Sequence, residues 1–307
     1  EGKTAYLYND TIDNLVPESA AAATQIATGA KVPNKTISVG SDDKPLKTIL
    51  EIAREKGKVT GLVTTSRITD ATPAAFAAHV RNRRDEHVIA EQLIEANVNI
   101  LCGGGKEFFI PEREKGSKRK DNRNLLEEAK KRNYTVIESA DEMGKSTGKK
   151  LLGLFNKGDM VYEMNRSGSN EPSIAEMTKK ALDILSSSNE GFFLMVEGSG
   201  IDHAAHHNDL TAMVLEVMAF DEAVKVAYEF QKNNIDTLLI ITGDHETGGL
   251  ATLSYSATSL KSGRNGVVAN LSELQQTSRW ATMSHTATPL FVWGIGPGSE
   301  EIKGWKH

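Results

Sequence analysis

The chain has 307 residues, of which 39% are hydrophobic and 25% are charged, and this balance excludes a disordered tail or a disulfide-stapled miniprotein. The net charge of −5 argues against binding to nucleic acid, and we interpret the one basic cluster, at 115–123, as a solvated loop. No apolar run approaches the roughly 20 residues that a membrane-spanning helix needs. We therefore expect a globular protein with no nucleic acid as a specific partner and no membrane span.

Short apolar runs alternate with amphipathic helical stretches. In chain order, the pattern predicts a helix at 46–56, strands at 59–65 and 98–101, helices at 125–132 and 174–185, a strand at 192–196, a long helix with an apolar stripe from 210 to 227, and strands at 237–242 and 289–293. The strands are apolar on both faces, as in a sheet covered by helices on both sides. We therefore predict an α/β fold, a three-layer αβα sandwich around a largely parallel central sheet.

The sequence shows no internal repeat and no linker rich in Pro, Gly or Ser, so we expect residues 1–307 to form a single domain. Two polar stretches without clear periodicity, at 103–123 and 252–284, are predicted to be surface loop insertions near a site. The single cysteine, Cys102, excludes an intrachain disulfide and a zinc site built from several cysteines. It follows an apolar stretch, so we expect a small buried side chain rather than a nucleophile.

Acidic and histidine residues follow the predicted strands. Glu197 follows the strand predicted at 192–196, Asp202 lies shortly beyond it, and Asp244 and His245 follow the strand predicted at 237–242. In α/β folds, ligands bind at this carboxyl edge of the sheet. Asp202 and His206 are four residues apart, which places them on one face of a helical turn, although that spacing alone is also typical of an ordinary surface pair. Together, these clusters fit divalent metals of the zinc class, with a carboxylate- and hydroxyl-rich pocket that suits magnesium.

The stretch 16–29 holds a serine, Ser19, before a run of four alanines, and it ends in glycine. In structural terms, Ser19 is predicted to be the N-cap of a tightly packed helix that stops at Gly29. In functional terms, a serine at a helix N-terminus faces unpaired N–H groups and the positive end of the helix dipole, where an alkoxide or a phosphate oxyanion is stabilised. The residues alone leave both interpretations open.

Five motifs are spread over almost the whole chain: ESAAAATQIATG at 18–29, DATPAAFAAHVRNR at 70–83, VEGSGIDHAAH at 196–206, TGDHETGG at 242–249 and HT at 285–286. In this order they resemble the motif series of the alkaline phosphatases. The resemblance implies hydrolysis of phosphate monoesters through a phosphoserine intermediate, with two zinc ions and one magnesium ion as cofactors.

The resemblance also implies a role for each matching position. Ser19 is the expected nucleophile, and Arg83 is expected to hold two phosphate oxygens in a bidentate contact. His203 is an expected substrate-binding residue near the phosphate. Asp70 and Glu18 are expected to lie behind the groups that contact substrate and metal.

Three metal sites follow from the same resemblance. The expected ligands of the first zinc are Asp202, His206 and His285; those of the second are Asp244 and His245; and those of the magnesium are Thr72 and Glu197. The first zinc would bind the leaving-group oxygen, and the second would lower the pKa of the serine hydroxyl. Phosphoryl transfer needs in-line positioning and charge neutralisation, and two metals with an arginine supply both.

Two departures from the family pattern are visible. Glu18 stands before the serine where the family has Asp, so we expect the arginine to be held in a different pose. The family begins with an apolar strand ending in Gly-Asp-Gly, whose Asp bridges the second zinc and the magnesium, and the residues upstream of Ser19 do not contain it. The expectation is a piece of a longer protein in which the second and third metal sites are incomplete.

Two other functions stay open. One is a phosphodiesterase or sulfate-ester hydrolase on the same metal scaffold, and the other is a catalytically silent phosphate- or metal-binding module. The resemblance further implies small-molecule phosphate monoesters as substrates, a homodimer, and a periplasmic or extracellular location. The first residues, EGKT, show no charged-then-apolar leader, which predicts an export signal that was removed or never present.

Overall fold

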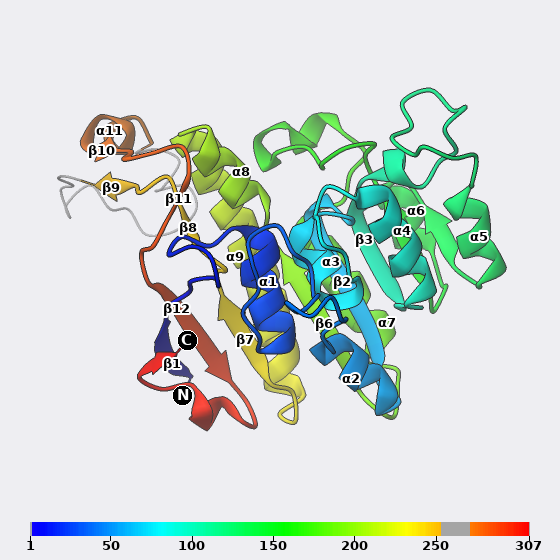
Figure 1. The fold of residues 1–307 in the computed structure, drawn as a ribbon, viewed down its shortest axis with the longest axis horizontal. Coiled ribbons are helices and arrows are strands. Elements are labelled where there is room, and N and C mark those ends of the chain that lie inside the picture. Colours follow the sequence, from blue (N-terminus) through cyan, green and yellow to red (C-terminus); the bar gives the residue numbers. More distant parts are fainter. Residues whose placement is uncertain (1, 253–270, 307) are drawn as a thin grey trace.

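The computed structural model describes residues 2–252 and 271–306. At its centre is a five-stranded sheet with the strand order β4-β5-β3-β2-β6, in which all neighbouring strands run parallel. Its strands are β2 (Val59–Arg67), β3 (Ile100–Gly104), β4 (Thr135–Ile137), β5 (Leu151–Leu154) and β6 (Phe192–Glu197). Figure 1 shows helices around this sheet. The predicted α/β fold is confirmed.

Each face of the central sheet has its own hydrophobic core. Leu62 and Phe193 pack into one core, whereas their strand neighbours Val63 and Phe192 pack into the other. The first core contains residues of α1 (Ser19–Thr28), α2 (Ile49–Glu55), α3 (Ala71–Ala77), α4 (Glu86–Glu95) and α5 (Leu125–Lys131), and the second contains residues of α6 (Ala140–Lys145), α7 (Ile174–Leu185) and α9 (Leu210–Asn233). Because successive strand residues point to opposite faces, the sheet lies between two helix layers, as predicted.

Capping residues set the ends of several helices. Thr48 caps α2 and Ser173 caps α7, and each forms a capping box with the glutamate three residues later. The helix predicted at 46–56 therefore begins at Ile49. Gly29 ends α1 with φ 72°, a left-handed conformation that glycine adopts without steric cost.

A second sheet has four strands in the order β13-β1-β12-β7. These are β1 (Lys3–Leu7), β7 (Leu239–Thr242), β12 (Leu290–Ile295) and β13 (Trp305–Lys306), and β12 is antiparallel to both β1 and β7. The prediction that the last two apolar strands are buried on both faces is wrong, since Ile240 is 50% exposed and Phe291 is 61% exposed. An apolar composition favours a strand but does not determine its partner.

Shorter elements complete the described part of the chain. They are α8 (Gly200–His206), α11 (Leu271–Thr277), β8 (Glu246–Thr247), β9 (Ala251–Thr252), β10 (Ser278–Arg279), β11 (His285–Thr286), η1 (Lys106–Phe108), η2 (Glu163–Gly168) and η4 (Ser299–Glu301). β8 pairs with β11, and β9 pairs with β10. Among the described helices, none is both long and apolar enough to cross a lipid bilayer.

The predicted insertion at 103–123 packs against the rest of the fold. The Arg119 side chain is fully buried and donates hydrogen bonds to the backbone carbonyls of His87 and Phe108. The interpretation of the basic cluster as a solvated loop is therefore wrong at this arginine. Cys102 is buried at 1% exposure, as predicted. The second insertion, 252–284, lies partly outside the described residues.

Candidate active site

Ser19 is the first residue of α1, and the N-cap is Glu18 rather than the serine, which corrects the sequence prediction. The Glu18 carboxylate accepts a hydrogen bond from the N–H of Ala21 at 3.1 Å, so it fills the capping position and the helix begins one residue later. The four alanines behind the serine are fully buried and pack α1 against the fold. The serine is thereby held at the positive end of the helix.

The Ser19 hydroxyl faces His245, with Oγ 3.0 Å from Nε2. The same nitrogen lies 3.1 Å from Oδ2 of Asp244. On the other side of the ring, Nδ1 lies 3.3 Å from the hydroxyl of Thr247, which donates its single hydrogen to Oδ1 of Asp202. Since a carboxylate can only accept and the Thr247 hydrogen is already used, both ring nitrogens of His245 face an acceptor, which favours the protonated imidazole. Burial alone would lower the pKa of His245, but the charge of Asp244 raises it above its ordinary value.

Asp202, His206 and His285 form a compact cluster. The two Nε2 atoms are 3.0 Å apart, and Oδ1 of Asp202 lies 3.5 and 3.6 Å from them. Nδ1 of His206 donates to the carbonyl of Met283, and Nδ1 of His285 donates to the carbonyl of Pro17, both at 2.8 Å. Since a carbonyl can only accept, each neutral ring presents an Nε2 lone pair to the cluster. Three acceptor atoms within 4.8 Å of one another thus fit a cation of the zinc class.

The serine and this three-ligand cluster are neighbours. The rings of His245 and His285 stack with their centroids 3.5 Å apart. β8 and β11 pair here, with Thr247 opposite His285. Asn9 donates to the backbone carbonyl of Asp244 at 2.6 Å, which ties the segment before α1 to the same place. Residues from both ends of the chain therefore build one site.

Arg83 reaches the start of α1. Its Nη1 donates to Oε2 of Glu18 at 2.7 Å, and its Nη2 donates to Oδ1 of Asp70 at 2.8 Å. The other oxygen of Glu18 accepts from the N–H of Lys35 at 2.5 Å, so the longer side chain still holds the arginine. Each terminal nitrogen of a guanidinium carries two hydrogens, so one N–H on each remains for an anion. Burial alone would raise the pKa of Asp70, but the charges of Arg83 and then Arg67 hold it below its ordinary value.

Glu197 ends β6 at the predicted edge of the central sheet. Thr64 donates a hydrogen bond to its Oε2 at 2.6 Å. Burial raises the pKa of Glu197 to about 7; the charges of Asp70 and Asp244 add to the shift, and hydrogen bonds from Thr64 and Thr72 oppose it. Glu197 therefore lies near two other acids, and a bound cation would offset this negative charge. A carboxylate beside two hydroxyls is a donor set that suits a hard cation such as magnesium.

His203 lies on α8 and lines a pocket of about 390 Å³. Met160 and Tyr162, which precede η2, line the same pocket, and so does His206. Because His206 also belongs to the three-ligand cluster, the pocket begins directly beside that cluster.

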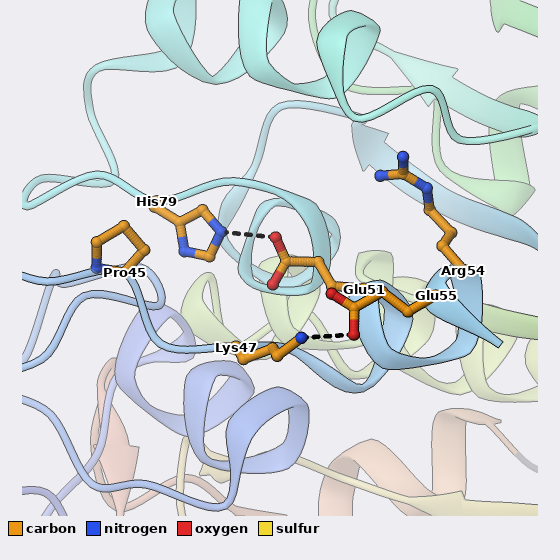
Figure 2. Close-up of a pocket in the computed structure, with 6 residues that line it drawn as sticks. All are labelled: Pro45, Lys47, Glu51, Arg54, Glu55 and His79. Atoms are coloured by element: carbon orange, nitrogen blue, oxygen red, sulfur yellow. Dashed lines mark hydrogen bonds and ion pairs between the residues drawn. The ribbon is translucent and has the colours of Figure 1, made fainter.

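A second hollow, of about 420 Å³, surrounds His79 (Figure 2). The Nε2 of His79 lies 3.1 Å from Oε1 of Glu51, and its Nδ1 lies 2.8 Å from a backbone carbonyl. Figure 2 also shows the ion pair between Lys47 and Glu55 in the same hollow. Glu51 thus pairs with His79, and Lys47 pairs with Glu55, within this hollow.

The sequence prediction missed several residues that contact predicted site residues, including Thr64, Arg67 and Thr247. Arg67 ends β2, with Nη2 3.6 Å from Oδ1 of Asp70, and Thr247 donates to Asp202 at 2.5 Å. Signals for Arg67 and Thr247 were present. Arg67 follows a predicted strand closely, as Glu197 does, and Thr247 lies within the TGDHETGG motif.

The family model for alkaline phosphatase matches residues 3–267. The chain belongs to the alkaline phosphatase family. The repressible alkaline phosphatase of Saccharomyces cerevisiae is 44% identical over 265 residues, which are 78% of this chain and 47% of the yeast protein. Alkaline phosphatase 4 of Bacillus subtilis is 33% identical over 354 residues, covering 96% of this chain and 75% of that protein.

A solved member of the family has the same fold. It is a variant of the alkaline phosphatase of the Antarctic bacterium TAB5 with magnesium bound in its M3 site, and it matches with a TM-score of 0.84 and 32% identity over 99% of this chain and 84% of that chain. The chain spans about half the length of the yeast alkaline phosphatase and about three quarters of the Bacillus one.

Proposed function

We propose that this chain hydrolyses phosphate monoesters through a phosphoserine formed on Ser19. The observation that carries the proposal is the convergence of three acceptor atoms, from Asp202, His206 and His285, beside a serine at a helix N-terminus. Membership of the alkaline phosphatase family supports it.

In the proposed reaction, Oγ of Ser19 forms a bond to phosphorus while the bond from phosphorus to the alcohol oxygen breaks, and the alcohol leaves with a proton. Water then attacks the phosphoserine, which releases inorganic phosphate and restores the serine. His245 and Asp244 orient the hydroxyl, since Nε2 of His245 lies within hydrogen-bonding distance of the Ser19 hydroxyl and of the Asp244 carboxylate. The N-terminus of α1 stabilises the negative charge on the phosphoryl oxygens.

Arg83 is the proposed phosphate-binding residue. Glu18 and Asp70 hold its two terminal nitrogens, and the remaining N–H on each can donate to two phosphate oxygens in a bidentate contact. His203, which faces the neighbouring pocket, is the proposed second substrate-binding residue. A phosphate monoester has three oxygens without an ester bond, so two can contact the arginine and the third can contact the helix N-terminus. A diester has only two such oxygens, and it cannot make all three contacts.

We also propose two zinc sites and one magnesium site. Their proposed ligands are Asp202, His206 and His285 for the first zinc, Asp244 and His245 for the second, and Thr72 and Glu197 for the magnesium. The first set supplies the three protein ligands that are typical of a catalytic zinc, whereas the second supplies two from the described residues. When bound, the ions supply positive charge that lowers the pKa of the serine hydroxyl and neutralises charge on the leaving oxygen. Magnesium in the TAB5 relative supports metal dependence.

The proposed substrates are small-molecule phosphate monoesters whose alcohol portion enters the pocket beside His206. Met160 and Tyr162 offer apolar and aromatic contact there. We further propose that residues 1–307 act as one domain, because β1 pairs with β12 across most of the chain. A homodimer and a periplasmic or extracellular location are proposed from family membership.

The test compares turnover of 4-nitrophenyl phosphate with that of a 4-nitrophenyl diester and 4-nitrophenyl sulfate, after addition of zinc and magnesium. Ser19→Ala is expected to lower monoester turnover at least about a thousandfold. The control is Ser139→Ala, which removes only the N-cap of α6, and it should leave turnover unchanged. Acid quenching and mass spectrometry should locate one phosphate on Ser19.

Each alternative has its own outcome. Faster turnover of the diester or the sulfate ester would show the related hydrolase. Phosphate binding without turnover of any ester would show a silent binding module. A phosphate located on another residue would refute the nucleophile.

A further inference from the structure

A second guanidinium, that of Arg67, lies beside the pair formed by Asp70 and Arg83. Its Nη2 lies 3.6 Å from Oδ1 of Asp70, the same oxygen that accepts a hydrogen bond from Nη2 of Arg83 at 2.8 Å. One carboxylate oxygen is therefore shared by two cations. Asp70 is only 9% exposed, so little water competes for this oxygen.

Arg67 is anchored on its far side. Its Nη1 donates to both oxygens of Asp159 at 2.7 Å, and its backbone N–H donates to the same carboxylate at 3.1 Å. Its Nε donates to Oε2 of Glu86 at 2.8 Å, and Thr69 donates to that oxygen at 2.7 Å. Arg67 is also the last residue of a central strand. Because a planar guanidinium with several carboxylate partners has little freedom to rotate, its position is fixed.

The contacts form a chain of alternating charges from Asp159 through Arg67, Asp70 and Arg83 to Glu18 at the start of α1. Asp70 precedes α3 in the N-cap position, yet its carboxylate makes no capping hydrogen bond to that helix. The two guanidiniums orient it, together with the backbone N–H of Ala71 beside it. Within this row of charges, Arg67 is the member whose position is fixed, and Arg83 is the member that would contact phosphate.

We propose that Arg67 is a positioning residue for phosphate binding: it fixes Asp70 in the orientation in which Asp70 holds the Arg83 guanidinium. This inference rests on the proposed function, in which Arg83 grips the phosphate. Without Arg67, the Asp70 carboxylate loses the cation that is anchored to the central sheet, and it can move together with the Arg83 guanidinium, which then keeps Glu18 as its second partner.

The test is a double-mutant cycle on the binding of inorganic phosphate, measured by calorimetry on the full chain with zinc and magnesium present. Arg67→Met is expected to weaken binding about tenfold when Asp70 is intact and less than about twofold when Asp70→Asn is already present. The control is Arg81→Met, since Arg81 pairs with Asp43 outside this chain of charges; it should leave phosphate binding unchanged. A purely structural role would not produce this dependence on Asp70.

A second variant guards against loss of folding. Asp159→Asn releases Arg67 from its far anchor, and it is expected to weaken phosphate binding about threefold in the parent chain and not in Arg67→Met.

Equal weakening by Arg67→Met in both Asp70 backgrounds, or no weakening, would overturn the inference. A parent chain that binds no phosphate would overturn it as well. Coupled phosphate binding in a chain that turns over no monoester would refute the proposed function and leave the positioning role standing.

Discussion

The substitution Glu18→Gln isolates the contact that holds the proposed phosphate-binding arginine. Oε1 of Glu18 accepts from the backbone N–H groups of Ala21 and Lys35, so the carbonyl of the glutamine must take that place. Its NH₂ group then faces Arg83, donor against donor, where Oε2 accepted a hydrogen bond at 2.7 Å. The helix cap is kept, and the ion pair is lost.

The magnitude follows from the exposure of the pair. A hydrogen bond between charged groups contributes roughly 1.5–3 kcal/mol to stability. The side chains of Glu18 and Arg83 are 18% and 26% exposed, and Asp70 still holds the guanidinium after the change. We therefore expect a loss of about 1–2 kcal/mol in the free energy of unfolding, which lowers the melting temperature by about 2–6 °C. Phosphate affinity is expected to fall about tenfold, because 1.4 kcal/mol corresponds to a factor of ten.

The chain offers a matched control in Glu51→Gln. Glu51 also combines a capping contact, to the N–H of Thr48, with a contact to a basic side chain, His79, and it lies in the hollow of Figure 2. Urea denaturation should show a similar loss of stability for both variants. Calorimetric titration with inorganic phosphate should show weaker binding for Glu18→Gln alone. If Glu18→Gln binds phosphate as tightly as the parent chain, the carboxylate does not position the arginine and the reasoning is refuted.

Three further outcomes are expected. Arg83→Lys should weaken inhibition by inorganic phosphate about tenfold or more, because an ammonium lacks the planar pair of donors; an unchanged inhibition constant would place the anion site elsewhere. Burial raises the pKa of the Cys102 thiol to about 12, so iodoacetamide at pH 8 should modify it only after unfolding in urea, and rapid labelling of the folded chain would contradict its burial. Tyr162→Ala should lower kcat/KM for aryl phosphates about tenfold relative to methyl phosphate; an unchanged ratio would move the leaving group out of this pocket.

The position of the candidate site could be predicted from the sequence because several of the site residues come directly after predicted strands. Asp202, Asp244 and Glu197 come after apolar runs, and the carboxyl ends of such strands meet at one edge of a sheet. The resemblance to the alkaline phosphatase motif series assigned Ser19 and His285 to the same site before their geometry was known. The lone-pair arrangement at the histidines could not be predicted, because it depends on which backbone carbonyl each Nδ1 meets.

Other features depend on long-range packing that local patterns do not encode. Asp159 binds Arg67 although 92 positions separate them in the sequence, and no sequence pattern pairs the two residues. The pairing of β1 with β12 likewise joins the two ends of the described chain, and the short stretch Lys3–Leu7 was not predicted as a strand. The N-cap error has a local cause: serine is a preferred cap, but the Glu18 carboxylate is long enough to reach the N–H of Ala21.

The negative charge of the candidate site predicts that metal ions and phosphate bind cooperatively. Arg83 already balances two carboxylates, so the charges of Asp202 and Asp244, joined by that of Glu197 above its pKa of about 7, repel an incoming phosphate dianion.

Cations in the site remove this repulsion. By linkage, each ligand must then raise the affinity of the other by the same factor. Calorimetry should therefore show phosphate affinity falling at least about tenfold after chelation, and zinc affinity rising by the same factor when phosphate is added. Chelation should also lower the melting temperature, by about 5–10 °C if metal was present at a hundred times its dissociation constant. If phosphate affinity is unchanged after chelation, the arginine and the helix N-terminus alone offset the repulsion from the three carboxylates. The charge argument would then fail.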